Sequence, residues 1–325
     1  MKNISVGHCD ELNYNPSKEG LPIARLNFRN LTPSSGDKRD KIFQFDGHFS
    51  KFRENKELCR KERLNKYYQD MGYSKKDFTE YILNVWESEN QEEFRVQRGD
   101  DKIVVTCKLT KEILVFDKEY NYLQDEGKTD FKYVDEVDAI SMQVPEDIIL
   151  QRMRDDYDDY IGSIHLCAAN DWSAEKSINQ SMKFVHKKVP YIKKVISSDR
   201  NIVRSILKNN NVFERTGAVN FYTESFINKH PDNNIEEKSI SRLLDGEGSL
   251  FLRFERQTIT PIKGEYFIFT IRTYFSDIKE LTKENRNYLK ESFFAKADRI
   301  NTFTSASSEI RNREKEFVEW VDAIE

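Results

Sequence analysis

The clearest alternation of apolar and polar residues in the chain lies between Leu250 and Ile278. Aromatic and β-branched residues recur along Leu250–Ile259, the residues Pro261 and Gly264 mark a turn, and a second arm follows over residues 265–274. The pattern predicts a β-hairpin. Its strands also carry Arg253, Glu255, Arg256, Gln257 and Arg272. Half-buried charges need partners, so the hairpin holds either a cross-strand ion-pair network or a ligand-facing site.

Strand-like patterns concentrate in the second half of the chain. Five strands are expected over residues 148–154, 160–167, 218–223, 249–259 and 266–275. Helical segments over residues 174–182 and 191–208 separate the second strand from the third. Strands gathered into hairpins with inserted helices are typical of α+β proteins, and we expect a PAS-like antiparallel sheet of five strands.

The remaining segments are expected to flank this sheet. Residues 1–40 are rich in Asn, Ser, Pro and Gly and predict an extended arm. Residues 41–325 are expected to form a single domain. Its other elements would be helices over 49–68 and 77–88, short strands over 103–107 and 112–116, and two C-terminal helices within 282–325.

Composition narrows the class of protein. The chain has 33% charged residues and a mean hydropathy of −0.76, but its 22 Phe and 15 Tyr indicate a globular protein. A net charge of −4 with interspersed signs argues against nucleic-acid or membrane-surface partners. No signal-like or membrane-spanning run occurs, and the four widely spaced cysteines form no metal or disulfide pattern. A cytoplasmic protein with reduced thiols is expected.

Common nucleotide, hydrolase and zinc motifs are absent, which leaves the five histidines as candidate ligands. His8, His48 and His230 lie in polar or loop-like surroundings, and His165 in the strand IHLCA reads as a buried core histidine. His186 differs, because apolar residues flank it in the segment KFVHKKVP. A neutral imidazole beside an apolar wall is a candidate axial ligand for haem iron.

Three segments carry a family resemblance. The first is PEDIILQRMRD at 145–155, followed by Trp172, Ala174, Glu175, Lys176, His186, Val189 and Pro190. The second and most specific joins ERQT at 255–258 to TIRTY at 270–274, and the third, at 43–68, is looser. Together they resemble the haem-dependent oxidative N-demethylase family, whose haem-binding subunit has a PAS-type fold. The likeness covers about residues 42–280.

The sequence departs from the family pattern at three places, one of which is the absence of an evident YKG-like element toward the C-terminus. The segment AVNFYTE keeps Asn220 but has Ala218 and Phe221 where the family has Arg and Trp. Residues 169–171 replace a proline-serine turn. The relative's substrate, dimethylamine, is therefore not transferred to this chain.

The resemblance implies a haem b cofactor with His186 as the ligand of its iron. Arg256 and Arg272 would pair with the haem propionates, with Tyr274 beside them, because guanidinium groups bind carboxylates well. Glu255, assisted by Gln257, would act as the acid or base and hold an amine cation. Neighbouring side chains on a strand alternate faces, so Glu255 and Arg256 compete for the same site.

The implied reaction is oxidation of a small amine by O2. A hydroxylated carbon next to nitrogen would collapse to an aldehyde and a dealkylated amine. The chain has no flavin or ferredoxin motif, so a separate reductase or other electron donor is expected. Two alternatives stay open: a haem or small-molecule sensor of PAS type that performs no turnover, and a haem-free interaction protein.

Overall fold

The computed structural model describes residues 3–8, 29–31, 40–153, 159–185, 211–233, 235, 239–244, 248–295 and 305–324. The strands are β1 (Arg29–Asn30), β2 (Tyr68–Asp70), β3 (Phe94–Arg98), β4 (Lys102–Cys107), β5 (Glu112–Asp117), β6 (Asp147–Met153), β7 (Asp159–His165), β8 (Phe213–Tyr222), β9 (Phe251–Pro261) and β10 (Tyr266–Asp277). The helices are α1 (Phe49–Tyr67), α2 (Lys75–Glu89), α3 (Glu136–Ser141), α4 (Ala174–Ser177), α5 (Met182–Val185), α7 (Ser241–Leu244), α8 (Lys283–Ala295), α9 (Ser305–Asn312) and α10 (Glu314–Asp322).

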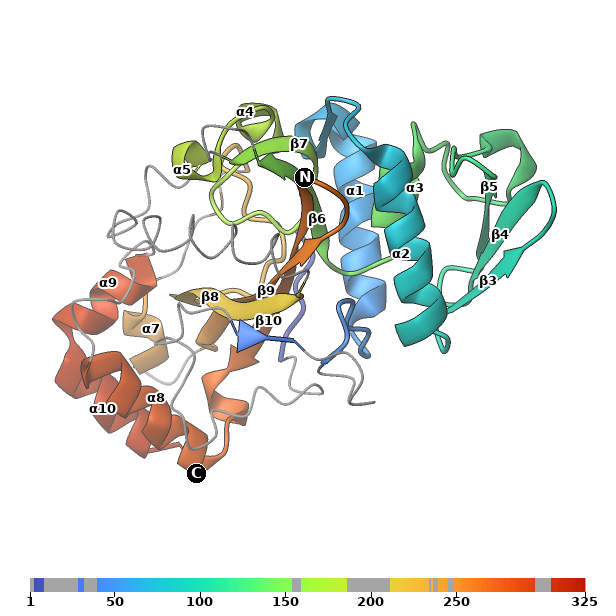
Figure 1. Ribbon diagram of the computed structural model, residues 1–325. Helices are drawn as coiled ribbons and strands as arrows, with labels where there is room; N and C mark the ends of the chain where they lie inside the picture. Colours follow the sequence, from blue (N-terminus) through green and yellow to red (C-terminus); the bar gives the residue numbers. More distant parts are fainter. Residues whose placement is uncertain are drawn as a thin grey trace.

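An antiparallel sheet of seven strands, in the order β1-β8-β9-β10-β6-β7-β2, forms the centre of the molecule (Figure 1). The α+β class is confirmed. The expected number of five strands is wrong: the five predicted strands, β6 to β10, lie together in the middle, and β1 and β2 extend the two edges. These edge strands have only two and three residues, which is too short for an alternating pattern to reveal them.

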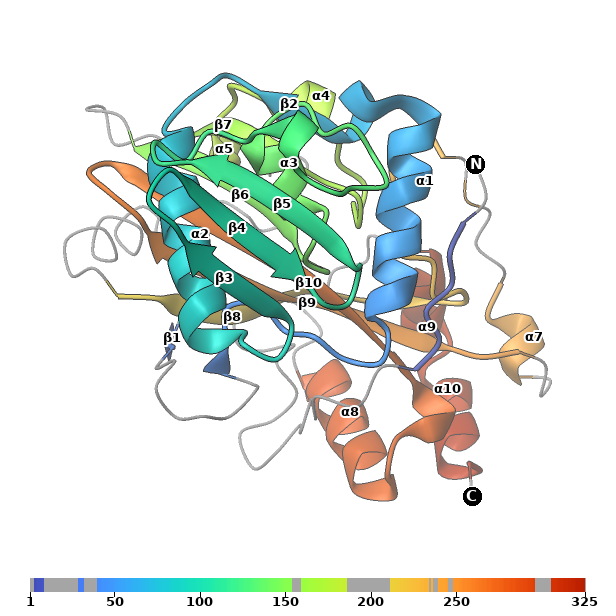
Figure 2. The same ribbon diagram turned by 90° about the vertical axis from the view of Figure 1, so that its right-hand side faces the viewer.

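One face of the large sheet, called the α1 face here, is covered by α1, α2, α3 and a second sheet of β3, β4 and β5 (Figure 2). Ile148, Leu150 and Ile268 of the large sheet belong to the same buried cluster as Ile82 and Trp86 of α2. The Trp86 ring stacks on Phe94 of β3 with centroids 4.0 Å apart. This cluster joins the small sheet and α2 to the large sheet.

The opposite face, called the α4 face here, packs against the segment that contains α4 and α5. Ile149, Phe267, Phe269 and Ile271 point to this face and share a buried cluster with Ala174 of α4. Trp172, Ile178 and Val185 pack against the same cluster. The α4 face therefore carries a broad wall of aromatic and branched apolar side chains.

The C-terminal helices form a separate cluster at one end of the sheet (Figure 1). Leu252 and Ile278 pack there with Leu289 of α8, Ile310 of α9 and Phe317 of α10. Two C-terminal helices were expected, and the described residues contain three, because the second predicted helix is interrupted between α9 and α10. The residue at this break, Arg313, has a non-helical backbone with φ −123° and ψ 37°.

Other boundaries differ from the sequence prediction for local reasons. The helix predicted over 174–182 is divided into α4 and α5, and Asn179 between them has a φ of 56°, which a continuous helix excludes. The sequence missed β3 and the short helix α3. The helix predicted over 191–208 and most of the predicted arm over 1–40 lie outside the described residues.

Candidate functional site

The register of β9 and β10 decides which of the predicted site residues share a face. Arg272 lies opposite Arg256, and Thr273 lies opposite Glu255. The pairing is continuous from Phe251 to Pro261, so side chains alternate without a bulge. Glu255 and Gln257 therefore lie on the α4 face. Arg256 and Arg272 are directly opposed, so both lie on the α1 face. Tyr274 is two residues from Arg272 and therefore lies on the same face.

On the α4 face, hydrogen bonds join four polar side chains in a row. Arg253 Nη1 donates to Glu255 Oε1 at 2.8 Å, and Gln257 Nε2 donates to Glu255 Oε2 at 3.0 Å. Arg215 Nε of β8 donates to Gln257 Oε1 at 2.7 Å. Arg253 is 0% exposed and Glu255 is 5% exposed. A buried carboxylate is thus held between a guanidinium and an amide, directly beside the apolar wall.

Arg253 also connects this row of polar side chains to the loop after β7. Its Nη2 donates to the carbonyl oxygen of Ala168 at 2.9 Å and to Thr273 Oγ1 at 3.3 Å. Its Nε has no hydrogen-bond partner within the described part of the chain, although it is buried. Such an orphaned donor is rare in folded proteins and needs an explanation.

A second buried carboxylate, Asp147, lies next to this group. It accepts hydrogen bonds from the backbone N–H groups of Cys167 and Ala168 at 2.7 and 2.9 Å. Burial raises the pKa of Asp147 to about 6; the Lys56 ammonium opposes this rise and the nearby Glu255 carboxylate adds to it. The α4 face therefore carries two buried carboxylates, Glu255 and Asp147.

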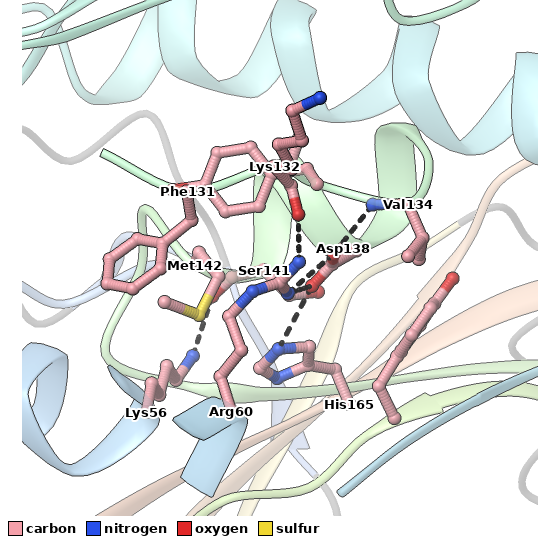
Figure 3. Close-up of polar contacts among 12 residues, drawn as sticks. Lys56, Arg60, Phe131, Lys132, Val134, Asp138, Ser141, Met142 and His165 are labelled. Atoms are coloured by element: carbon pink, nitrogen blue, oxygen red, sulfur yellow. Dashed lines mark hydrogen bonds and ion pairs between the residues drawn. The ribbon is translucent and has the colours of Figure 1, made fainter. Parts of the chain in front are cut away.

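Lys56 of α1 supplies the second buried cation. Its Nζ donates to the carbonyl oxygens of Ser141, Val144 and Glu146 at 2.7, 2.7 and 2.6 Å, and Figure 3 shows the first of these contacts. All three N–H donors of the ammonium are therefore satisfied. Burial lowers the pKa of Lys56, and the Asp147 carboxylate opposes this shift.

On the α1 face, the two arginines already have carboxylate partners. Arg256 Nε donates to Glu214 at 2.7 Å, and Arg272 Nη2 donates to Asp46 at 2.6 Å. The Arg272 guanidinium also lies 3.9 Å from the centre of the Phe52 ring. These contacts form the ion-pair network that was the alternative interpretation of the hairpin, and they hold the segment before α1 on the sheet.

Tyr274 belongs to the same network. Its hydroxyl hydrogen-bonds the side chain of Gln44, and burial raises its pKa well above the ordinary value for a phenol. Because Tyr274, Arg256 and Arg272 face away from Glu255, the structure does not bring the predicted propionate-binding residues and the predicted acid-base residues together.

His186 lies outside the described residues. The described residue before it, Val185, packs against the apolar cluster of the α4 face. Trp172, another residue of the family resemblance, packs on the same cluster. The chain therefore enters the segment containing His186 from the face that carries Glu255.

The sequence predicted that His165 is a buried core histidine. It is buried on the α1 face, where its Nε2 lies 3.8 Å from Asp138 Oδ1 (Figure 3). Arg60 Nη1 donates to both oxygens of Asp138 at 2.7 Å, and the backbone N–H of Val134 donates at 2.9 Å. Burial, together with nearby cations, lowers the pKa of His165 well below its ordinary value. It is a neutral core histidine, as its strand pattern indicated.

The sequence prediction gave no site role to Arg253, Asp147 or Lys56. Arg253 was noted only as one of several charges on a strand. Asp147 lies in the segment PEDIILQRMRD and Lys56 in the looser segment at 43–68, but neither was given a role, and their importance arises from contacts between segments far apart in the chain. The one available signal was the alternation of side chains along a strand: Arg253 is two residues from Glu255 and must lie on the same face.

Comparison with models of protein families identifies the family of this chain. The model of the family described as haem-dependent oxidative N-demethylase, alpha subunit-like, matches residues 34–307. The chain belongs to this family. No curated protein matches it. The family description implies a haem-dependent oxidoreductase of the N-demethylase type, and none of the described helices combines the length and apolar character needed to cross a bilayer.

The residues of the α4 face fit the haem that the family description implies. Phe267, Phe269 and Ile271 offer an apolar wall for a flat macrocycle. The α1 face fits less well, because its arginines are occupied by Asp46 and Glu214. Within the described part of the chain, no three His, Cys, Asp or Glu side chains group to hold a metal ion.

Proposed function

We propose that this protein is a haem-dependent oxidoreductase that oxidises a small amine with O2 at the α4 face. The observation that carries the proposal is the buried Glu255, held by Arg253 and Gln257 beside an aromatic wall in a chain of this family. Two motifs of the resemblance, ERQT and TIRTY, meet in this hairpin. The α4 face also leads into the segment that contains His186.

A PAS-type arrangement is part of this proposal. The hairpin of β6 and β7 is followed by the segment with α4 and α5, and then by β8, β9 and β10, of which the last pairs with β6. Of the inserted segment, α4 and α5 lie on the α4 face. A haem b held by His186 would contact the apolar wall of this face.

The bound haem would supply the activation of O2, with two electrons from a separate reductase. The overall change would convert an N-methyl amine, O2, two electrons and two protons into the demethylated amine, formaldehyde and water. Glu255 would bind the substrate ammonium and accept its proton, so that the nitrogen lone pair becomes available. Arg253 holds Oε1 and Gln257 holds Oε2, and together these contacts would fix the orientation of the carboxylate toward the substrate.

This assignment gives the predicted residues different tasks. Glu255 and Gln257 act on the substrate, and His186 holds the iron. Arg256, Arg272 and Tyr274 support the sheet from its other face through Glu214, Asp46 and Gln44. The apolar wall keeps bulk water away from the reacting nitrogen, which strengthens the interaction between Glu255 and a cation.

Replacing Glu255 by Gln tests the role of its carboxylate. The variant keeps a side chain of the same shape, so we expect the haem spectrum to be retained and reductant-dependent O2 consumption with amines to fall by about 100-fold or more. The exposed Glu280 on the turn after β10 provides a matched control, Glu280→Gln. Full turnover in Glu255→Gln would remove Glu255 from the mechanism.

A further inference from the structure

We propose that the substrate is a zwitterion, an N-methylated α-amino acid whose carboxylate binds Arg253 and whose ammonium binds Glu255. The inference rests on the proposed function, since it names the substrate class of the same site. It arises from two features of the α4 face: an orphaned guanidinium donor, and a balance of buried charges that a simple amine would disturb.

The first feature is the hydrogen bonding of Arg253. Its Nη1 is used by Glu255, and its Nη2 by Ala168 and Thr273. Its Nε has no partner within the described part of the chain, and the side chain is completely buried. An unpaired donor of a buried cation is costly, and a carboxylate is the acceptor that a guanidinium binds best. A ligand oxygen at Nε would complete the hydrogen bonding.

The second feature is the charge of the group. Arg253 and Glu255 are both buried and are in direct contact with each other. One cation and one carboxylate therefore balance. Arg215 lies beyond Gln257 and is only partly buried, so solvent screens its charge more strongly.

The ligand that preserves this balance carries both signs. A simple ammonium ion would add one positive charge to a neutral buried group, and a fatty carboxylate would add one negative charge, and both are unfavourable in a medium of low polarity. A zwitterion adds none. Because Arg253 and Glu255 are in direct contact at 2.8 Å, the two charges of the ligand must also be close together, as they are in an α-amino acid.

Three ligands of similar shape test the proposal by calorimetric titration of the unaltered protein. N,N-dimethylglycine carries both charges, isovalerate carries only the carboxylate, and N,N-dimethylethylamine carries only the ammonium. We expect N,N-dimethylglycine to bind at least about tenfold more tightly than either of the others. Equal or tighter binding of N,N-dimethylethylamine or isovalerate overturns the proposal.

Two variants then assign the contacts. In Arg253→Gln the ratio of the affinity for N,N-dimethylglycine to that for N,N-dimethylethylamine should fall to near one. In Glu255→Gln the ratio of the affinity for N,N-dimethylglycine to that for isovalerate should fall to near one. Arg152→Gln, at a partly exposed ion pair with Glu265, is the matched control and should keep both preferences. If Arg253→Gln does not fold, the ligand series and Glu255→Gln still decide, and preferences that survive in Glu255→Gln contradict the proposal.

The haem spectrum separates this inference from the proposed function. A haem-bound protein without any preference for the zwitterion overturns the substrate class and leaves the haem-dependent reaction intact. A protein that binds no haem but prefers the zwitterion keeps the binding site and contradicts the reaction. If Arg253→Gln loses haem and the unaltered protein shows no preference, Arg253 serves the carboxylates of the cofactor, and the proposal is wrong.

Discussion

Replacing Glu146 by Gln should abolish a pH dependence of stability that arises on the α1 face. Glu146 is fully buried just before β6, and one of its oxygens accepts a hydrogen bond from the backbone N–H of Gln44 at 2.8 Å. Its other oxygen, Oε2, has no partner within the described residues. Arg256 and Arg272, the nearby cations, are already matched by Glu214 and Asp46. The ionised form of Glu146 would add a third carboxylate to two matched cations and is therefore disfavoured.

The size of the effect follows from the pKa of Glu146. Burial raises it from 4.5 to about 7, although Arg272 and Arg256 oppose the rise. Because the folded protein binds this proton more tightly than the unfolded chain, stability is greatest at low pH and is lost as the pH rises from 4.5 toward 7. The full loss corresponds to about 3 kcal/mol, of which about 2 kcal/mol falls between about pH 5 and about pH 8.

Urea unfolding at these two pH values measures the effect. The Gln side chain cannot ionise and keeps the acceptor for Gln44, so Glu146→Gln should gain stability relative to the unaltered protein by about 2 kcal/mol on going from the lower to the higher pH. The exposed Glu280→Gln controls for the loss of one charge and should show no such gain. A stability difference that is the same at both pH values would refute the reasoning.

Two further substitutions test the packing and charge assignments. Lys56→Met leaves three buried carbonyl oxygens without donors and Asp147 without its cation, so we expect a loss of about 3 kcal/mol in the free energy of unfolding, whereas Lys61→Met, at an exposed position on the same helix, should change little. Trp86→Ala removes the ring that stacks on Phe94 between α2 and the small sheet, and should cost about 3–5 kcal/mol in the same measurement. Loss of less than about 1 kcal/mol in either variant would contradict the corresponding assignment.

The sequence predicted the centre of the large sheet well because the physical signal there is strong. The second hairpin strand was expected over residues 266–275 and spans Tyr266–Asp277, since aromatic and β-branched residues alternate along it. The edge strands β1 and β2 and the short helix α3 are too brief to carry a periodic pattern. Local patterning thus locates long elements and misses short ones.

The candidate site could be predicted only in part. Alternation showed that Glu255 and Arg256 compete for one face, but the sequence could not say which of them faces the inserted helices. Arg253 also reaches the carbonyl oxygen of Ala168, 85 residues away in the chain, and Asp147 accepts from the backbone N–H groups of Cys167 and Ala168 in the loop after β7. Such contacts depend on how the strands are ordered, and no local motif encodes that order.

The central claim is that the protein binds haem at a site that reacts with amines. The most direct measurement is the absorption spectrum of the protein purified after expression with ample haem, oxidised and reduced, before and after addition of candidate substrates. The account predicts a Soret band that shifts when a substrate binds near the iron. A protein that has no Soret band, and acquires none when haem is added, would contradict it.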